Sequence, residues 1–334
     1  MNKFDLFYEE MSKRYLDIIH INLSPSSSFR YRCEFGYKHN SYTMYDNQKN
    51  ILYLKNFKYA ANSIQKVMPD LLFEINRSLD LKDKLFQINF RSNDLNKIMV
   101  TLIYHKNISN KLIDLVKSLS KLLNINIILR SKNFINFTSS KFLESTIDEY
   151  KVYQTDNCFY QPNKYLLNKM ITKVKQMIEF PNDLLELYCG IGTFTLPLSK
   201  YFNQILATES NREANKCLIK ALEKNQIKNI HPARISSDEV VMLFDGKKFN
   251  RMHGKSLSSF NFSHVLVDPP RSGLTKEVIQ ILKEFKNIIY ISCNPKTYFR
   301  DVDLLKEYKI NKIEIFDQFP NTEHIEIVSL LSLR

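Results

Sequence analysis

Two short motifs near the carboxyl-terminal end of the chain contain residue types that can do covalent or acid–base chemistry. The tetrapeptide Ser-Cys-Asn-Pro at 292–295 follows an apolar run typical of a buried strand, which leaves Cys293 at the exposed end of that strand. A thiol in such a place is well positioned to act as a nucleophile. The second motif, at 319–326, contains His324 and ends in Glu326. By residue type alone, Glu326 is a polar residue entering a final strand, and His324 is typical of a surface or capping histidine.

The other cysteines give no sign of a metal or disulfide site. They are Cys33, Cys158, Cys189 and Cys217. The total of five is odd, and no two cysteines have the Cys-x-x-Cys spacing, which argues against a disulfide framework, a zinc site or an iron–sulfur cluster. We therefore expect no metal, and we expect these four thiols to be buried and inert.

A rigid segment at 267–273 follows another buried strand and holds two charged residues. Pro269 and Pro270 keep the chain out of helical conformations where it leaves the sheet. The segment therefore presents Asp268 and Arg271 to a ligand.

A glycine turn, Gly190-Ile-Gly192, joins a predicted strand to a helix. Glycine lets the backbone turn tightly and approach a ligand closely. No third glycine follows at the spacing of dinucleotide-binding proteins. Glu209 ends the next strand, 19 residues after Gly190, where a carboxylate can accept hydrogen bonds from both ribose hydroxyls of an adenosine. The pattern favours an adenosine ligand without a pyrophosphate, and an ordinary strand–helix turn is the alternative.

Buried strands alternate with helical patterns from about residue 150 onward. The predicted strands are 183–189, 204–209, 263–268, 287–292 and 325–333, and the predicted helices are 211–225, 276–285 and 297–308. This alternation predicts an α/β domain whose parallel sheet is covered on both faces. Ligands of such sheets bind beyond the carboxyl ends of the strands, which is where the residues singled out above lie.

The first 150 residues have a different pattern, that of an α+β module. The predicted strands are 29–35, 85–90, 98–104 and 125–129, and a helix is predicted at 109–123. A run of small polar residues at 24–28 is interpreted as a loop and not as a domain linker. We expect two domains, residues 1–150 and 151–334.

Charge and hydropathy limit the classes of protein to which the chain can belong. The formal net charge is +13, with 22 Lys and Arg against 15 Asp and Glu in residues 1–150, so the charge is spread over both halves. This excess suits a polyanion such as RNA, although a coding bias towards lysine would give the same pI. No apolar run is long enough to span a membrane, and residues 1–15 lack the apolar core of a secretory signal. We expect a cytoplasmic protein.

Together these motifs resemble the family of RNA methyltransferases that act on carbon 5 of uridine, and most closely its tRNA-modifying members. The matching pieces run from FRYRCEF through LLELYCGIGTF, VDPPRSGL and SCNP to FP-x-T-x-H-x-E, and they cover roughly residues 29–334. The resemblance implies a Rossmann-like, S-adenosylmethionine-dependent methyltransferase domain at 151–334 and an RNA-binding module at 1–150. It also implies tRNA as the partner, the T-loop uridine at position 54 as the target, transfer-messenger RNA as a second substrate, and a monomeric enzyme.

The resemblance assigns roles to individual residues. Cys293 stands where the family has its nucleophile, which adds to carbon 6 of uracil, and Glu326 where it has the base that removes the carbon 5 proton. Positions that bind S-adenosylmethionine are occupied by Gln161, Tyr188, Thr193, Glu209 and Asp268. Phe159 and Arg271 stand where the flipped uracil is held. Thr193 departs from the Asn often found there, which predicts altered hydrogen bonding to the cofactor.

Three alternatives stay open at this point. The same chemistry on ribosomal RNA is the nearest, although relatives of that kind usually carry four cysteines for an iron–sulfur cluster. A non-catalytic RNA chaperone would leave Cys293, Glu326 and Asp268 without a purpose. A small-molecule or amino-group methyltransferase is disfavoured because amino-methylating enzymes often carry an aromatic residue where Arg271 stands.

Overall fold

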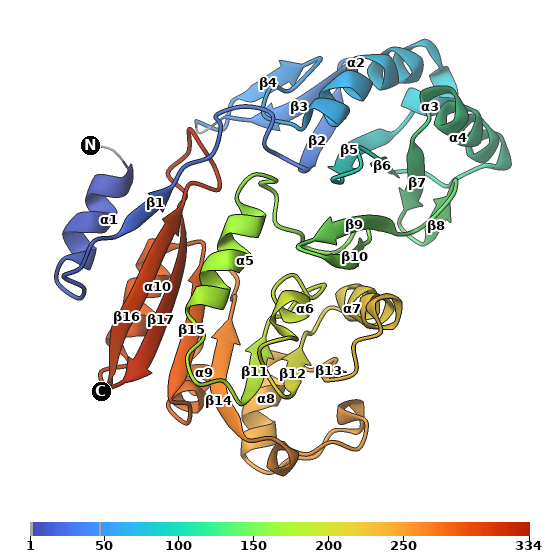
Figure 1. Ribbon diagram of the computed structural model, residues 1–334. Coiled ribbons are helices and arrows are strands. Elements are labelled where there is room, and N and C mark those ends of the chain that lie inside the picture. Colours follow the sequence, from blue (N-terminus) through green and yellow to red (C-terminus); the bar gives the residue numbers. More distant parts are fainter. Residues whose placement is uncertain (1–2, 47) are drawn as a thin grey trace. The chain divides into compact units, whose positions relative to one another are not determined.

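The computed structural model describes residues 3–46 and 48–334, which fold into two compact units (Figure 1). The first unit comprises the chain up to Ser24 together with Ile147–Tyr153 and Cys158–Arg334, and the second comprises Pro25–Thr146 and Gln154–Asn157.

This division differs from the single boundary expected at residue 150. The chain up to Ser24 folds with the carboxyl-terminal part, because α1 (Lys3–Met11) packs its apolar side chains into the core of that unit. The connection between the units at Ser24 falls within the run at 24–28, which forms neither helix nor strand. The run is a loop as predicted, but the interpretation that it is not a domain linker was wrong. Nothing in the polarity of this run distinguishes a connection between units from a loop within one.

The first unit is built on an eight-stranded sheet. Its strands, from one edge to the other, are β1 (His20–Asn22), β16 (Tyr308–Phe316), β17 (Glu326–Leu333), β15 (Asn287–Ser292), β14 (Phe262–Val267), β11 (Asp183–Leu187), β12 (Ile205–Thr208) and β13 (Ile230–Ala233). Adjacent strands are parallel except where β17 pairs antiparallel with β15 and β16. The order changes direction at β11, because β12 lies on one side of it and β14 on the other. The predicted α/β fold is confirmed.

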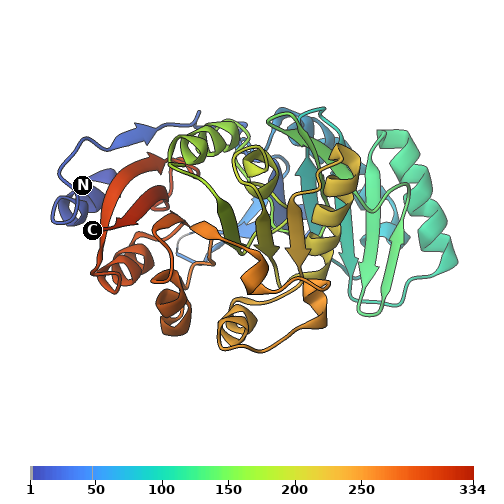
Figure 2. The same ribbon diagram turned by 60° about the horizontal axis from the view of Figure 1, so that its bottom comes forward.

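Helices cover both faces of this sheet, as Figure 2 shows. The helices and short 3-10 turns that follow α1 in this unit are α5 (Leu167–Gln176), α6 (Thr195–Leu198), α7 (Arg212–Asn225), α8 (Ser237–Phe244), η1 (Asn250–Met252), η2 (Leu257–Ser259), α9 (Lys276–Leu282) and α10 (Pro295–Asp303). Helices α5 to α7 lie on one face and α8 to α10 on the other.

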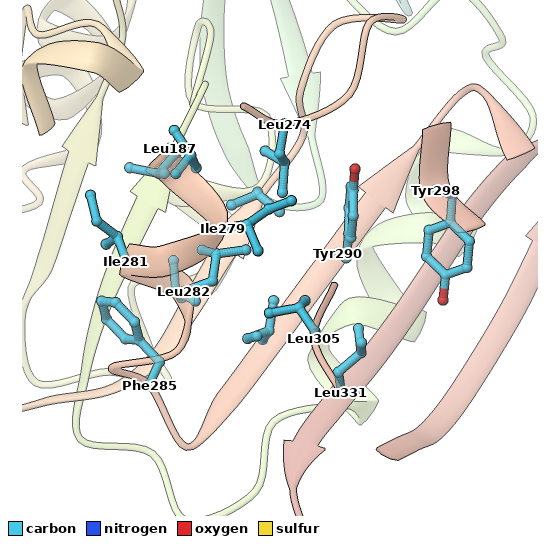
Figure 3. Close-up of a cluster of buried hydrophobic side chains, with 14 of the residues drawn as sticks. Leu187, Leu274, Ile279, Ile281, Leu282, Phe285, Tyr290, Tyr298, Leu305 and Leu331 are labelled. Atoms are coloured by element: carbon cyan, nitrogen blue, oxygen red, sulfur yellow. The ribbon is translucent and has the colours of Figure 1, made fainter. Parts of the chain in front are cut away.

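The core under α8 to α10 holds the carboxyl-terminal half of the sheet in place. Figure 3 shows side chains from α9 and from the strands, among them Ile279, Tyr290 and Leu331, packed against one another. Phe7 of α1 is buried in the same cluster. Full burial of such side chains stabilises the fold by roughly 1.5–3 kcal/mol each. This packing holds the strand ends in place.

The second unit is an α+β structure with a seven-stranded sheet. Its strands in spatial order are β4 (Ile51–Leu54), β3 (Ser41–Tyr45), β2 (Arg32–Lys38), β5 (Leu85–Ser92), β6 (Ile98–Tyr104), β7 (Asn126–Ser131) and β8 (Phe134–Phe137), and its helices are α2 (Asn62–Arg77), α3 (Leu79–Lys82) and α4 (Asn110–Leu123). Neighbouring strands are antiparallel except for β6 and β7, which α4 connects. Buried side chains of alternate strand positions, such as Ile88, Phe90 and Val100, form one core with the helices. A two-stranded sheet, β9 (Leu143–Ile147) and β10 (Tyr150–Gln154), follows β8.

Within residues 3–46 and 48–334, no helix is both long enough and apolar enough to cross a bilayer.

Candidate active site

A cavity of about 420 Å³ opens at the carboxyl end of the parallel strands of the first unit. Its lining consists of Phe159, Gln161, Tyr188, Gly190, Glu209, Asp268, Pro269, Pro270, Arg271, Cys293, Phe319 and Glu326. Most of these residues lie directly after a strand, so the sheet itself brings together segments that are far apart in the sequence.

The strand register explains why these residues meet. Leu187 at the end of β11 is paired with Thr208 of β12 and with Val267 of β14, so the residues that follow these three strands emerge side by side. Ser292, the last residue of β15, pairs with Ile327 of the antiparallel strand β17. The residue after β15, Cys293, and the first residue of β17, Glu326, therefore lie at the same end of the sheet.

The glycine turn after β11 brings the backbone close to Glu209. The amide of Gly190 donates a hydrogen bond to Glu209 Oε2 at 3.0 Å, and the amide of Asn211 donates to Oε1 at 2.7 Å. Tyr188, just before the turn, has a φ of 60°, a conformation that is uncommon for an aromatic residue and typical of functional sites. The turn thus fixes the Glu209 carboxylate at the rim of the cavity.

Gly192 is required for packing. Its φ is 90°, and a Cβ there would lie 2.6 Å from Cδ1 of Leu218 in α7. Glycine therefore lets the turn pack against Leu218 of α7 and Leu196 of α6.

The segment from Asp268 to Arg271 is attached to the cysteine motif by hydrogen bonds. The carbonyl oxygen of Arg271 accepts from Asn294 Nδ2 at 2.9 Å and from Thr297 Oγ1 at 3.4 Å. The guanidinium of Arg271 lies 2.9 Å from Nε2 of His324. Because arginine can only donate, His324 accepts this hydrogen bond through an unprotonated Nε2.

Asp301 of α10 holds the end of the same segment from inside the protein. This fully buried carboxylate accepts hydrogen bonds from the amide of Leu274 at 2.9 Å and from the hydroxyl of Tyr290 at 2.6 Å, and it forms an ion pair with Arg300 at 2.6 Å. Gly273, with a φ of 74°, passes so close that a Cβ would lie 2.6 Å from the carboxylate. Asp301 was not singled out from the sequence, because an acidic residue in a helical pattern looks like a solvated one.

Asn294 positions the residue next to it. Its side chain accepts a hydrogen bond from the amide of Lys296 at 3.2 Å and caps α10, while Pro295 occupies the first turn. The helix begins here and not at residue 297 as predicted. Cys293 is thereby held between the last residue of β15 and the cap of α10, with its thiol half-buried in the cavity.

The cavity disfavours negative charge. Burial raises the pKa of Asp268 to about 7. Burial also raises the pKa of Glu326 well above its usual value, an effect to which Asp268 adds and which Arg271 opposes. The pKa of the Cys293 thiol is raised to about 11 by burial and then by Glu326 and Asp268, whereas Arg271 lowers it. Two carboxyl groups and a thiol thus face a space whose electrostatics favour a cationic ligand.

A further acidic residue, Glu186, lies in β11. It is almost completely buried, and burial followed by the charge of Asp268 raises its pKa to about 8. Its Oε2 has no hydrogen-bond partner among the residues that the structure describes. From the sequence, Glu186 was expected only as part of a strand, and a carboxylate within an apolar strand was the signal that could have revealed it.

The structure brings most of the predicted site residues together. Those that line the cavity are Phe159, Gln161, Tyr188, Glu209, Asp268, Arg271, Cys293 and Glu326. Thr193 lies outside this lining and is buried in the turn before α6. Phe319 is a lining residue that sequence reasoning did not single out, although it belongs to the motif at 319–326.

The fold and the cavity define a Rossmann-like methyltransferase. The sheet changes direction at β11, a glycine turn follows that strand, and acidic residues follow β12 and β14. The chain belongs to the tRNA (uracil-5-)-methyltransferase family, whose model matches residues 2–334. The resemblance found in the sequence and the expected enzyme class, a methyltransferase, are confirmed.

Two relatives illustrate the similarity over the whole chain. A tRNA/tmRNA (uracil-C(5))-methyltransferase of Campylobacter lari is 43% identical over 316 residues, which cover 91% of this chain and 90% of that protein. A protein of the same description from Acinetobacter baylyi is 36% identical over 328 residues, 93% of this chain and 91% of the relative.

A solved structure has the same fold. The Pyrococcus abyssi tRNA (uracil-54, C5)-methyltransferase in complex with S-adenosyl-L-homocysteine superposes with a TM-score of 0.78. The two chains are 21% identical, and the match covers 98% of this chain and 82% of the other.

Proposed function

We propose that this protein transfers a methyl group from S-adenosylmethionine to carbon 5 of the T-loop uridine at position 54 of tRNA, through a covalent bond between Cys293 and carbon 6 of the base. The observation that carries this proposal is the convergence of Cys293 and Glu326 on one cavity from the paired strands β15 and β17. A thiol beside a buried carboxyl group is what a covalent addition followed by proton removal requires.

The residues of the cavity fit the proposed cofactor. The half-exposed Glu209 carboxylate, held by two backbone amides, provides acceptors for the ribose hydroxyls. The raised pKa values of Asp268 and Glu326 fit a ligand that carries positive charge, because a nearby cation favours the ionised carboxylates. Gln161 and Tyr188 complete the binding site. Thr193, buried in the turn before α6, is the remaining proposed position. When bound, S-adenosylmethionine supplies the methyl group as an electrophile.

The residues of the chain perform the remaining chemistry in two stages. The Cys293 thiol first loses its proton to solvent. The thiolate then forms a bond to carbon 6, which moves the electrons of the carbon 5–carbon 6 double bond into an enolate and makes carbon 5 nucleophilic enough to accept the methyl group. The Glu326 carboxylate then removes the proton from carbon 5, the double bond forms again, and the sulfur–carbon bond breaks to release the thiolate. Arg271 lowers the pKa of Cys293 and, with Phe159, holds the flipped base.

Removal of the target base from its stack costs a few kcal/mol, which favours a loop uridine over one in a helix. Residues Pro25–Thr146 form an RNA-binding module on this proposal. Support comes from the family to which the chain belongs and from the net charge of +13. The names of the Campylobacter and Acinetobacter relatives add transfer-messenger RNA as a second substrate.

The proposal can be tested with purified components. The protein is incubated with methyl-labelled S-adenosylmethionine and unmodified transcripts of tRNA, transfer-messenger RNA and ribosomal RNA fragments, and 5-methyluridine is mapped by nuclease digestion and mass spectrometry. We expect label at the T-loop uridine of tRNA and none with Cys293→Ala, which should still bind both substrates. Label on ribosomal RNA alone would refute the assignment to tRNA. RNA binding without methylation would instead favour the alternative of a non-catalytic RNA chaperone.

A further inference from the structure

The first helix of the chain reaches the loop that precedes Glu326. Lys3 of α1 directs its ammonium group at three oxygen atoms of the connection between β16 and β17. The distances from Nζ are 2.5 Å to the carboxylate of Asp317, 3.2 Å to the carbonyl oxygen of Phe319 and 3.2 Å to that of His324. An ammonium has three donors, and here each has an acceptor.

This contact is shielded from water, unlike most ion pairs of the protein. The side chains of Lys3 and Asp317 are only 11% and 12% exposed. Exposed ion pairs contribute little because water screens them and the side chains lose entropy. A shielded pair with matched hydrogen bonds holds its geometry, and removal of one partner leaves the other charge buried without compensation. Lys3 therefore fixes both ends of the 317–324 loop at one point.

The loop that Lys3 holds leads directly to the residues of the cavity. Phe319 lines the cavity, and Glu326, the first residue of β17, follows His324 by two positions. The imidazole of His324 accepts a hydrogen bond from the guanidinium of Arg271, which also lines the cavity. A shift of this loop would therefore move both the Phe319 ring and the imidazole that accepts from Arg271.

We propose that Lys3 is a positioning residue for methyl transfer, which holds the 317–324 loop so that Arg271 and Glu326 face the bound base. This inference rests on the proposed function, since it concerns the geometry of that reaction. Lys3 has no hydrogen bond to the thiol of Cys293 or the carboxylate of Glu326 in the described part of the chain. It acts through the carbonyl oxygens of Phe319 and His324, which it holds in place.

The charge on Lys3 also affects the hydrogen bond between His324 and Arg271. Burial lowers the pKa of His324, and the positive charges of Arg271 and Lys3 lower it further, against the opposing effect of Glu323. The neutral imidazole that results can accept from Arg271, whereas the protonated form cannot. Loss of the Lys3 charge should therefore raise the pKa of His324, so that on acidification its hydrogen bond to Arg271 is lost at a higher pH than in the wild type.

The test compares Lys3→Met with Lys3→Arg and with Lys13→Met in the full-length protein. Lys13 lies just beyond α1 and pairs with Glu10 at the exposed surface, so its replacement removes the same charge without touching the loop. We expect Lys3→Met to lower kcat for tRNA methylation by about tenfold to a hundredfold, the usual effect of a small displacement of reacting groups. The melting temperature should fall, because Asp317 loses its partner, so kcat is measured well below it. The affinity for S-adenosylmethionine, measured by calorimetry, should change little, and Lys3→Arg should recover most of the activity and the stability.

Histidine NMR reports whether the charge of Lys3 reaches His324, whereas the loss of kcat at unchanged cofactor affinity separates a positioning role from a purely structural one. The pKa of His324, assigned with a His324→Gln variant, should rise in Lys3→Met and stay unchanged in Lys13→Met. If the wild type methylates tRNA and Lys3→Met does so equally fast, the inference is wrong. It is also wrong if Lys3→Met loses cofactor binding and thermal stability together, since Lys3 would then only stabilise the fold. A wild-type protein that methylates no RNA would refute the proposed function instead.

Discussion

At the scale of single residues, the protonation state of the cavity decides what chemistry can begin. A Cys293 thiol with a pKa of about 11 is almost fully protonated at neutral pH, so it is a poor nucleophile until a partner changes its surroundings. The small thiolate fraction also makes the thiol less susceptible to oxidation. Glu326 and Asp268 raise this pKa further, and Arg271 is the charged residue that lowers it.

Alkylation of the free protein should report this pKa directly. The rate at which iodoacetamide modifies Cys293 should rise with pH from neutrality towards about 11, because the thiolate fraction grows tenfold with each unit below the pKa. Arg271→Gln removes a charge that favours the thiolate, so the curve should move to higher pH. Mass spectrometry follows the modified peptide, and Cys293→Ala gives the background. A rate that is flat between pH 7 and 10 would show that burial does not control this thiol.

Replacement of Glu326 separates the two stages of the proposed reaction. Glu326→Gln keeps the size and hydrogen bonding of the side chain but removes its basicity. Addition of the thiolate and acceptance of the methyl group should proceed, and the protein should then remain bonded to methylated RNA. A denaturing gel should show a protein–RNA adduct that depends on S-adenosylmethionine and disappears when Cys293→Ala is added.

A 5-fluorouridine substrate is the matched control, because fluorine cannot be removed as a proton and should trap the wild type in the same way. Near wild-type turnover by Glu326→Gln without an adduct would exclude Glu326 as the base. His324 would then be the next candidate, because its Nε2 is unprotonated where it accepts from Arg271.

Glu209 offers a test of the cofactor site. Glu209→Ala should weaken the binding of S-adenosylmethionine by about 1–3 kcal/mol, the usual cost of lost hydrogen bonds to a charged acceptor. Calorimetry measures the change. Glu213→Ala is the control, since Glu213 lies in the first turn of α7 and pairs with Lys216. An unchanged dissociation constant in Glu209→Ala would place the ribose elsewhere.

At the scale of elements, local patterns predicted some segments well and missed others for physical reasons. The bounds of β6 and β15 agree with the apolar runs, because both strands are buried along most of their length. Helix α2 was missed because Pro69 lies inside it, and β16 because its lysines hide the strand pattern. The cavity residues that follow strands could be named in advance, whereas Phe319, Lys3 and Asp301 owe their places to contacts with distant segments.

The turn at Gly273 gives a prediction for the element that carries Arg271. Gly273→Ala places a Cβ 2.6 Å from the Asp301 carboxylate at a φ of 74°, so it should lower both the free energy of unfolding and the rate of methylation. Gly254→Ala is the control, because its φ is 81° but a Cβ there meets nothing within 4 Å. Backbone strain alone should cost that variant about 1–2 kcal/mol. Urea unfolding measures both, and equal losses in the two variants would show that the contact with Asp301 is unimportant.

At the scale of the whole molecule, the positive charge should govern the affinity for RNA. Lysine and arginine side chains that neutralise phosphates release counterions, so the logarithm of the tRNA association constant should fall steeply and linearly with the logarithm of salt concentration. Filter binding between about 50 and 200 mM salt tests this, where several phosphate contacts would weaken binding by roughly a thousandfold. S-adenosylmethionine binding is the control and should depend little on salt. An RNA affinity that does not change with salt would show that contacts between lysine or arginine side chains and phosphates do not account for RNA binding.

The strand β1 pairs with β16, so His20 lies beside Glu314 although most of the chain separates them. The second unit, Pro25–Thr146 with Gln154–Asn157, is complete once residue 157 has been synthesised. On a translating ribosome, β1 cannot pair with the sheet until β16 has left the exit tunnel. Until then α1 and β1 lack their docking site. Contacts of such long sequence separation form slowly and expose apolar side chains in the meantime. The eight-stranded sheet of the first unit can therefore be completed only after β16 and β17 have been synthesised.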